Sequence, residues 1–202
     1  MYIGRFVVVG QTPAGTPYLG YRVSSRSFPN RRIAVGDDRA VVLPSADAPP
    51  TDNPYVSYNC ARILGDTAVV ANGSHVDPII DKVSIGYGLR DAIALSLLAM
   101  DYEHDVYNTP RIVAAIDGAG EGYIGIITED KLLVTAAPVS AGRALLIATY
   151  EVTEPTAFEL PGSCPDELVN ALMDCEYELP VAGLVVMPVD DEYMLTARSV
   201  IA

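Results

Sequence analysis

Short apolar runs rich in valine and isoleucine recur along most of the chain, and this recurrence constrains the fold more than any other feature. Glycine, proline, asparagine or aspartate stands close to the end of each run, as expected for strands that are separated by turns. The first three runs are YIGRFVVVG, YLGYRVSS and RAVVLPS, at residues 2–10, 18–25 and 39–45. In the second run Tyr21 and Val23 alternate with Arg22 and Ser24, so one face can be buried while the other carries polar groups.

The middle of the chain changes from strand to helix. Residues 55–75 contain two β-branched halves that meet at Leu64-Gly65-Asp66, and a hairpin is the simplest interpretation. One helix is predicted within HVDPIIDKVSIG, residues 75–86. A stronger one is predicted within residues 87–105, where the apolar side chains recur at spacings of four, four and three: Leu89, Ile93, Leu97 and Met100.

After Pro110 the strand pattern returns, with one late helix predicted in residues 164–178. Strands, then helices, then strands, a helix and strands again indicate an α+β protein with two antiparallel sheets and helices outside them. The chain has 202 residues and is 50% hydrophobic, which is enough to bury a conventional core. We therefore expect a single domain that spans residues 1–202.

Charge and composition exclude several classes of function. The 13 basic and 26 acidic residues give a net charge of -13, which opposes general binding to nucleic acid or to anionic membranes. No apolar run has transmembrane length, and the run Phe6–Val9 is too short for a secretory signal. Three cysteines without paired spacing argue against a disulfide framework or a zinc site. A cytoplasmic protein is expected.

Positive charge is nevertheless concentrated in one segment, YRVSSRSFPNRR, residues 21–32. It holds four of the 13 basic residues and several small polar ones: Arg22, Arg26, Arg31, Arg32, Ser24, Ser25, Ser27 and Asn30. A guanidinium grips phosphate oxygens two at a time, and hydroxyls and loop N–H groups satisfy the rest. Arg31 and Arg32 are interpreted as solvated turn residues, whereas for Arg22 and Arg26 a functional and a solvated role are both open.

A second polar cluster lies in NPYVSYNCARILGD, residues 53–66. Strand alternation predicts that Tyr58, Cys60 and Arg62 share one face, with Asn59 and Ala61 on the other. Such an edge could line a pocket, and Arg62 could help Cys60 to ionise as a nucleophile. A small buried thiol is the preferred interpretation of Cys60.

The third cluster, MDYEHDVYN at residues 100–108, ends the strongest predicted helix. Glu103 and His104 could transfer protons, and the flanking aspartates could accept protons or bind a cation, although a solvated acidic helix end is the default interpretation. A metal site that uses His75 and His104 lacks supporting ligand spacing. DGAGEGYIG, residues 117–125, lies between two predicted strands and is interpreted as a hairpin turn, not as a phosphate loop.

Several strings taken together resemble the archaeal-type IMP cyclohydrolases: MYIGR, GYRVSSRSFPNR (20–31), NPYVSYNCAR (53–62), VVANGSHVDPI (69–79) and LAMDYEHDVYNTPRI (98–112). The resemblance implies closure of the second ring of 5-formamidoimidazole-4-carboxamide ribonucleotide to IMP, the last step of IMP synthesis. No cofactor is expected, and nothing in this chemistry demands a metal. It also implies a four-layered αββα fold like that of N-terminal-nucleophile hydrolases, but without a terminal nucleophile, because the sequence begins Met1-Tyr2. A homo-oligomer is expected.

Within these strings we divide the roles as a hypothesis. Arg22 and Arg26, with Ser24, Ser25 or Asn30, form the side of the pocket that holds phosphate or the carboxamide oxygen. The formamido group is oriented by a further set, Tyr58, Asn59 and Arg62, and Cys60 lines the pocket. Glu103 is the candidate for proton transfer, with Tyr58 as the alternative.

Two other functions stay open at this point. One is an amide hydrolase of the same architecture that uses Cys60 as its nucleophile. The other is a protein that binds purine nucleotides without catalysis.

Overall fold

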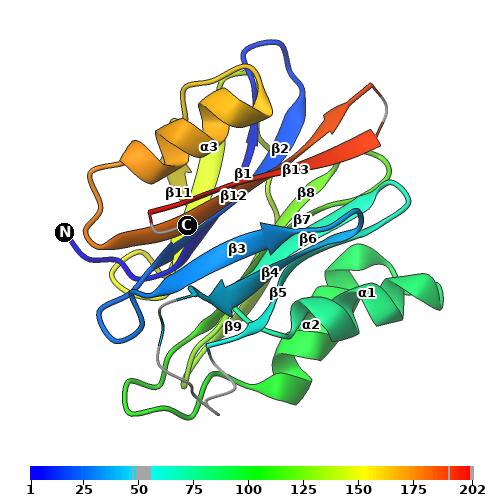
Figure 1. The fold of residues 1–202 in the computed structure, drawn as a ribbon. Coiled ribbons are helices and arrows are strands. Elements are labelled where there is room, and N and C mark those ends of the chain that lie inside the picture. Colours follow the sequence, from blue (N-terminus) through cyan, green and yellow to red (C-terminus); the bar gives the residue numbers. More distant parts are fainter. Residues whose placement is uncertain (47, 49–55, 191, 201–202) are drawn as a thin grey trace.

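The computed structural model describes residues 1–46, 48, 56–190 and 192–200. Within these ranges the protein is a mixed α/β structure of two antiparallel sheets and three α-helices (Figure 1). None of the helices in this part of the chain is both long and apolar enough to span a membrane.

The first sheet joins strands from the two ends of the chain. Strand β1 lies next to β2, and the neighbours on either side come from the last third of the sequence. The order is β11 (Thr156–Phe158), β10 (Ala144–Ala148), β1 (Phe6–Gln11), β2 (Pro17–Ser24), β12 (Pro180–Val189) and β13 (Glu192–Ser199). This order brings the residues before β1 close to the end of β10.

In the second sheet each strand pairs with its neighbour in sequence. Its order is β3 (Arg31–Val35), β4 (Arg39–Pro44), β5 (Tyr58–Leu64), β6 (Thr67–Ala71), β7 (Arg111–Ile116), β8 (Gly122–Ile127) and β9 (Leu132–Ala136). The connection from β6 to β7 is long and contains both helices of this half, α1 (Val76–Ser84) and α2 (Leu89–Met100).

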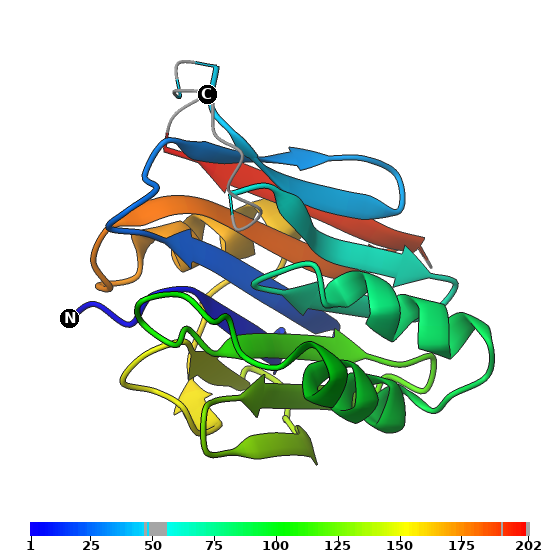
Figure 2. The same ribbon diagram turned by 90° about the horizontal axis from the view of Figure 1, so that it is seen from below.

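The alternation of apolar side chains explains the packing. Val7 and Val9 of β1 point into a core shared by the two sheets, whereas Phe6 and Val8 point the other way, to α3 (Pro165–Asp174). Helices α1 and α2 lie side by side and cover the outer face of the second sheet (Figure 2). Each sheet therefore packs on its partner with one face and on helix with the other.

Most predicted elements are confirmed, and the differences have physical causes. The helix predicted within residues 87–105 is shorter than that segment: α2 ends at Met100. The next residue, Asp101, has a positive φ of 56°, which does not continue a right-handed helix. The segment with Arg31 and Arg32 was expected to be a turn, which is wrong. Both residues begin β3, where they pair with Pro44 and Leu43 of β4.

A β-bulge in β5 overturns the predicted division of its faces. Ala40 of β4 pairs with Ala61, but the next residue of β4, Val41, pairs with Asn59, so Cys60 is the extra residue. Past the bulge the alternation is reversed. Arg62 therefore lies on the side of Asn59 and not with Tyr58 and Cys60, which are buried in the core between the sheets.

The outward pair binds helix α1. Asn59 Nδ2 and Arg62 Nη1 both donate to Asp77 Oδ1, each at 2.8 Å. The ion pair is partly buried, with side-chain exposures of 19% for Arg62 and 31% for Asp77. Both residues thus serve to hold α1 on the sheet.

This contact predicts a measurable coupling. Arg62→Ala and Asp77→Ala should each lower the free energy of unfolding by about 1 kcal/mol, as measured by urea unfolding. The loss in the double variant should be smaller than the sum of the two single losses, by at least about 0.5 kcal/mol. The exposed pair Arg39 and Asp38 is the matched control, with a coupling close to zero. Strict additivity for Arg62 and Asp77 would contradict the role given to this pair.

Candidate functional site

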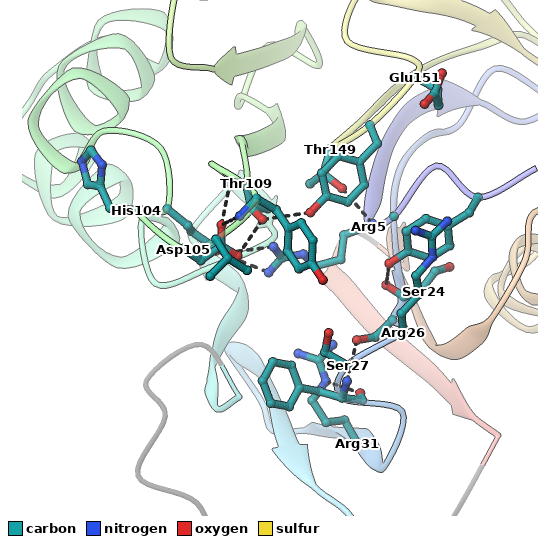
Figure 3. Close-up of a pocket in the computed structure, with 18 residues that line it drawn as sticks. Arg5, Ser24, Arg26, Ser27, Arg31, His104, Asp105, Thr109, Thr149 and Glu151 are labelled. Carbon is teal, nitrogen blue, oxygen red and sulfur yellow. Dashed lines mark hydrogen bonds and ion pairs between the residues drawn. The ribbon is translucent and has the colours of Figure 1, made fainter.

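A cavity of about 650 Å³ lies where four segments that are distant in sequence meet (Figure 3). They are the residues before β1, the end of β2 with the loop to β3, the loop after α2, and the end of β10. The lining comes from positions 2, 4, 5, 24–28, 31, 103–107, 109 and 149–151. Sheet pairing, not proximity in sequence, builds this site.

A buried ion pair forms the floor of the cavity. Arg5 Nη2 and Nη1 donate to the two carboxylate oxygens of Glu103 at 2.9 and 3.3 Å, and Nη1 also donates to the Asn72 carbonyl at 3.1 Å. The side chains are only 12% and 3% exposed. Burial lowers the pKa of Arg5, but the charge of Glu103 and the nearby phenols of Tyr58 and Tyr21 outweigh it and raise that pKa well above its ordinary value. Arg5 is a fixed positive charge.

The turn that delivers Arg5 to this position depends on Gly4. Its φ of +73° lies in the left-handed region, and a Cβ there would be 2.2 Å from Thr149 Oγ1. Thr149 Oγ1 in turn accepts a hydrogen bond from the Arg5 backbone N–H at 3.2 Å. The end of β10 therefore fixes the backbone from which the Arg5 side chain enters the cavity.

Residues 72–75 pack behind the Arg5–Glu103 pair and are fixed by hydrogen bonds to β7. The Asn72 side chain accepts from the Ile112 N–H at 2.8 Å, and His75 Nε2 lies 2.9 Å from the Ile112 carbonyl. Burial lowers the pKa of His75 to about 3, so the imidazole is neutral and Nε2 donates. A Cβ on Gly73 would lie 2.9 Å from Arg111 Nη1, which itself is 3.8 Å from Glu103 Oε1. A side chain at Gly73 would therefore displace the end of Arg111 that lies beside Glu103.

The loop after α2 forms one wall, and Asp105 organises it. Its carboxylate accepts from the N–H groups of Tyr107 and Thr109 and from Thr109 Oγ1, at 2.8 to 3.1 Å. Thr109 Oγ1 also lies 2.9 Å from Tyr150 OH. These bonds tie the wall to the end of β10, while Val106 at the tip is 90% exposed. The solvated helix end expected here is wrong for Glu103, which is buried, and right for exposed His104.

The loop from β2 to β3 forms the opposite wall and carries hydroxyls and guanidinium groups. Ser25 Oγ accepts from the Phe28 N–H at 2.9 Å, and Arg31 Nε donates to the Phe28 carbonyl at 3.0 Å, so the loop is closed on itself. Arg31 is buried and lines the cavity, which corrects its interpretation as a solvated residue. The Arg26 guanidinium lies 4.0 Å from the centre of the Tyr2 ring. Ser24 Oγ is buried and has no hydrogen-bond partner among the described residues.

Four of the predicted site residues line the cavity: Ser24, Ser25, Arg26 and Glu103. The other six do not: Arg22, Asn30, Tyr58, Asn59, Cys60 and Arg62. Asn30 is exposed, and its carbonyl accepts from the Ser45 N–H at 3.0 Å. Asn59 faces α1, and the bulge places Arg62 on the same face.

Arg22 lies under α3 and not in the cavity, where it was predicted to be. Its guanidinium is fully buried and donates to the carbonyls of Leu172, Cys175 and Tyr177, at and beyond the C-terminal end of α3. The alternation of β2 was predicted correctly, but α3 covers the polar face. Arg22 therefore hydrogen-bonds carbonyls at the C-terminal end of α3 that lack a partner within the helix, and it does not hold a ligand in the cavity.

Tyr58 and Cys60 lie behind the site, in the core between the sheets. Tyr58 OH is 2.7 Å from Tyr21 OH, and the Cys60 thiol donates to the Ala40 carbonyl at 3.4 Å. Burial raises the pKa of Cys60 above its ordinary value, so the thiolate is disfavoured. A nucleophilic role for Cys60 is contradicted by this burial.

Sequence reasoning missed Arg5, Tyr2, Thr149 and Tyr150. One signal for Arg5 was present, since it is the lone charge in the run YIGRFVVVG and belongs to the string MYIGR. Nothing local marks Thr149 or Tyr150, whose place depends on the pairing of β10 with β1. No group of three or more His, Cys, Asp or Glu side chains is placed to hold a metal ion within the described ranges.

Comparison with known proteins gives matches over nearly the whole chain. The family model described as IMP cyclohydrolase-like protein matches residues 2–192. A protein named IMP cyclohydrolase from Natronomonas pharaonis is 49% identical over 194 residues, and one from Methanocella arvoryzae is 45% identical over 196, each alignment covering 96% of both chains. Among solved structures, the chain is similar to a Gly-1 mutant of Anbu from Hyphomicrobium sp. strain MC1. The alignment covers 98% of this chain and 88% of the Anbu chain, with a low TM-score of 0.39 and 8% sequence identity.

Replacing Arg22 and replacing Arg26 should have different effects on the free energy of unfolding. Arg22→Ala leaves three carbonyls without their donor and should lower the free energy of unfolding by about 2–4 kcal/mol. Arg26→Ala, at an exposed position, should change it by about 0.5 kcal/mol or less. Equal, small losses in thermal and urea unfolding would show that Arg22 does not anchor the end of α3.

Proposed function

The chain belongs to the family of IMP cyclohydrolase-like proteins, and we propose that it converts 5-formamidoimidazole-4-carboxamide ribonucleotide to IMP and water in the cavity floored by Arg5 and Glu103. One observation carries the activity. Proteins named IMP cyclohydrolase match at 42–49% identity over most of the chain.

The reaction makes modest demands on protein chemistry. The substrate supplies both the nucleophile, its carboxamide nitrogen, and the electrophile, its formyl carbon, so no covalent enzyme intermediate is needed. Fixing the two arms in a reactive geometry can supply about 7–11 kcal/mol of the barrier. The remaining need is a preorganised donor for the charge that develops on the formyl oxygen, typically worth about 10²–10³ in rate.

The wall formed by the loop from β2 to β3 suits the phosphate of the nucleotide. Arg26 and Arg31 carry guanidinium groups on this wall, and Ser25 carries a hydroxyl. Guanidinium and hydroxyl groups are donors that suit phosphate oxygens. With the phosphate at this wall, the rest of the nucleotide extends into the cavity toward the Arg5–Glu103 pair. We therefore place the base of the nucleotide beside that pair.

We also propose that the fold is related to that of N-terminal-nucleophile hydrolases and that the protein is a homo-oligomer. Two sheets that pack face to face, with α3 on one outer face and α1 and α2 on the other, support the αββα arrangement of N-terminal-nucleophile hydrolases. A cytoplasmic location and a homo-oligomer stay predictions from the sequence.

A Cys60-dependent amide hydrolase is not supported, because Cys60 is buried away from the cavity. A protein that only binds the nucleotide would share the pocket but would show no turnover.

A direct assay distinguishes these functions. The purified protein is mixed with the formylated ribonucleotide, ultraviolet absorbance is followed against an enzyme-free blank, and the product is identified as IMP by chromatography. We expect turnover by the wild type, and a kcat within about threefold of it for Cys60→Ala, because that side chain only packs in the core. Binding without turnover would leave a nucleotide-binding protein, and loss of turnover in a folded Cys60→Ala variant would restore the thiol nucleophile.

A further inference from the structure

Arg5 has hydrogen-bond donors to spare at the floor of the cavity. A guanidinium carries five N–H donors. The bonds to Asn72 and Glu103 use three of them, two on Nη1 and one on Nη2. The Nε–H and the second Nη2–H have no acceptor among the described residues, and Arg5 lines the cavity, so both can serve a molecule bound there.

Both oxygens of Glu103, by contrast, are committed to Arg5. Each accepts one hydrogen bond from it, and Arg111 Nη1 lies 3.8 Å from Oε1. A two-point pair of this kind fixes the plane of the guanidinium as well as its position. The geometry is that of a carboxylate that holds an arginine still, and it is not the geometry of a free proton acceptor.

We propose that Arg5 is a catalytic residue, which donates hydrogen bonds to the formyl oxygen as negative charge develops on it, and that Glu103 is a positioning residue that acts through Arg5. This rests on the proposed function. It replaces the expectation from the sequence that Glu103 itself transfers the proton.

The chemistry balances without an added reagent. The carboxamide nitrogen forms a bond to the formyl carbon, and the electron pair of the carbonyl bond moves to the oxygen, where Arg5 stabilises it. The proton lost by that nitrogen ends on the same oxygen. The hydroxyl then leaves as water with the hydrogen of the formamido nitrogen, whose electrons form the new ring double bond. Arg5 keeps its own protons throughout, since a guanidinium is not deprotonated in proteins.

A ligand-binding test on the unmodified protein addresses the contact directly. Xanthosine monophosphate differs from IMP by one oxygen on the ring carbon that derives from the formyl group, so it places an oxygen where Arg5 should donate. Calorimetry should show that xanthosine monophosphate binds about tenfold or more tightly than IMP, the value of one added charge-assisted hydrogen bond. Equal binding would overturn the role of Arg5 and leave the proposed function intact, whereas absence of binding by both nucleotides would count against the proposed function itself.

Variants test the division of roles. Arg5→Lys cannot reproduce the fork and should lower kcat about 10²–10³-fold while the Kd for IMP changes less than about tenfold. Glu103→Gln should lower kcat in the same way with an unchanged shape of the pH profile, and the double variant should be no worse than the poorer single one, because the two residues act as a unit.

Arg143→Lys is the matched control. Arg143 is exposed, lies outside the cavity and pairs with Glu159, so its kcat should equal that of the wild type. Wild-type kcat in a folded Arg5→Lys variant would overturn the proposal. Loss of one limb of the pH profile in Glu103→Gln alone would return the proton transfer to Glu103. The preference for xanthosine monophosphate should vanish in Arg5→Lys.

Discussion

The buried ion pair between Arg5 and Glu103 is the contact on which the site depends. Arg5 stands immediately before β1 of the first sheet, and Glu103 lies in the loop that follows α2, which packs on the second sheet. Removing two charges from water is costly, and apolar replacements of such pairs are often neutral or stabilising. Stability alone therefore does not account for the pair. What it provides is a guanidinium at a fixed place, with donors turned to a cavity.

That local positive charge sits in a strongly acidic molecule. The formal net charge is -13, yet the cavity collects Arg5, Arg26 and Arg31. Three carboxylates line the same cavity, Glu103, Asp105 and Glu151; Glu103 is paired with Arg5, and Asp105 accepts from N–H groups of its own loop. An anion is therefore expected to bind through particular donors of the cavity and not to the surface as a whole, which fits a nucleotide substrate better than a polyanion.

The strands and helices could be predicted because their signals are local. The alternation in β2 and the helical spacing in α2 are properties of short windows of sequence. The layer that covers a polar face is not local, and for this reason Arg22 was placed in the pocket when it lies under α3. The bulge at Cys60 has no signature in the residue types around it either, and it placed Arg62 on the face of Asn59, where both contact α1.

The candidate site was predictable to a similar extent. Ser24, Ser25 and Arg26 form one polar wall because they are consecutive, and composition was enough to find them. Arg5, Thr149 and Tyr150 come together only through the pairing of β1 with β10, which follows from the whole topology. The strings that suggested the family contain part of both groups, since MYIGR includes Arg5 and GYRVSSRSFPNR includes the wall, but none of them reaches Thr149 or Tyr150.

The most direct test of this account is a crystal structure of the protein with bound IMP. The account predicts the phosphate within hydrogen-bond distance, about 3 Å, of Arg26 or the serines of the β2–β3 loop, and the ring carbon that derives from the formyl group beside Arg5. A nucleotide bound outside this cavity, or one whose phosphate lies on the Arg5–Glu103 floor, would contradict it.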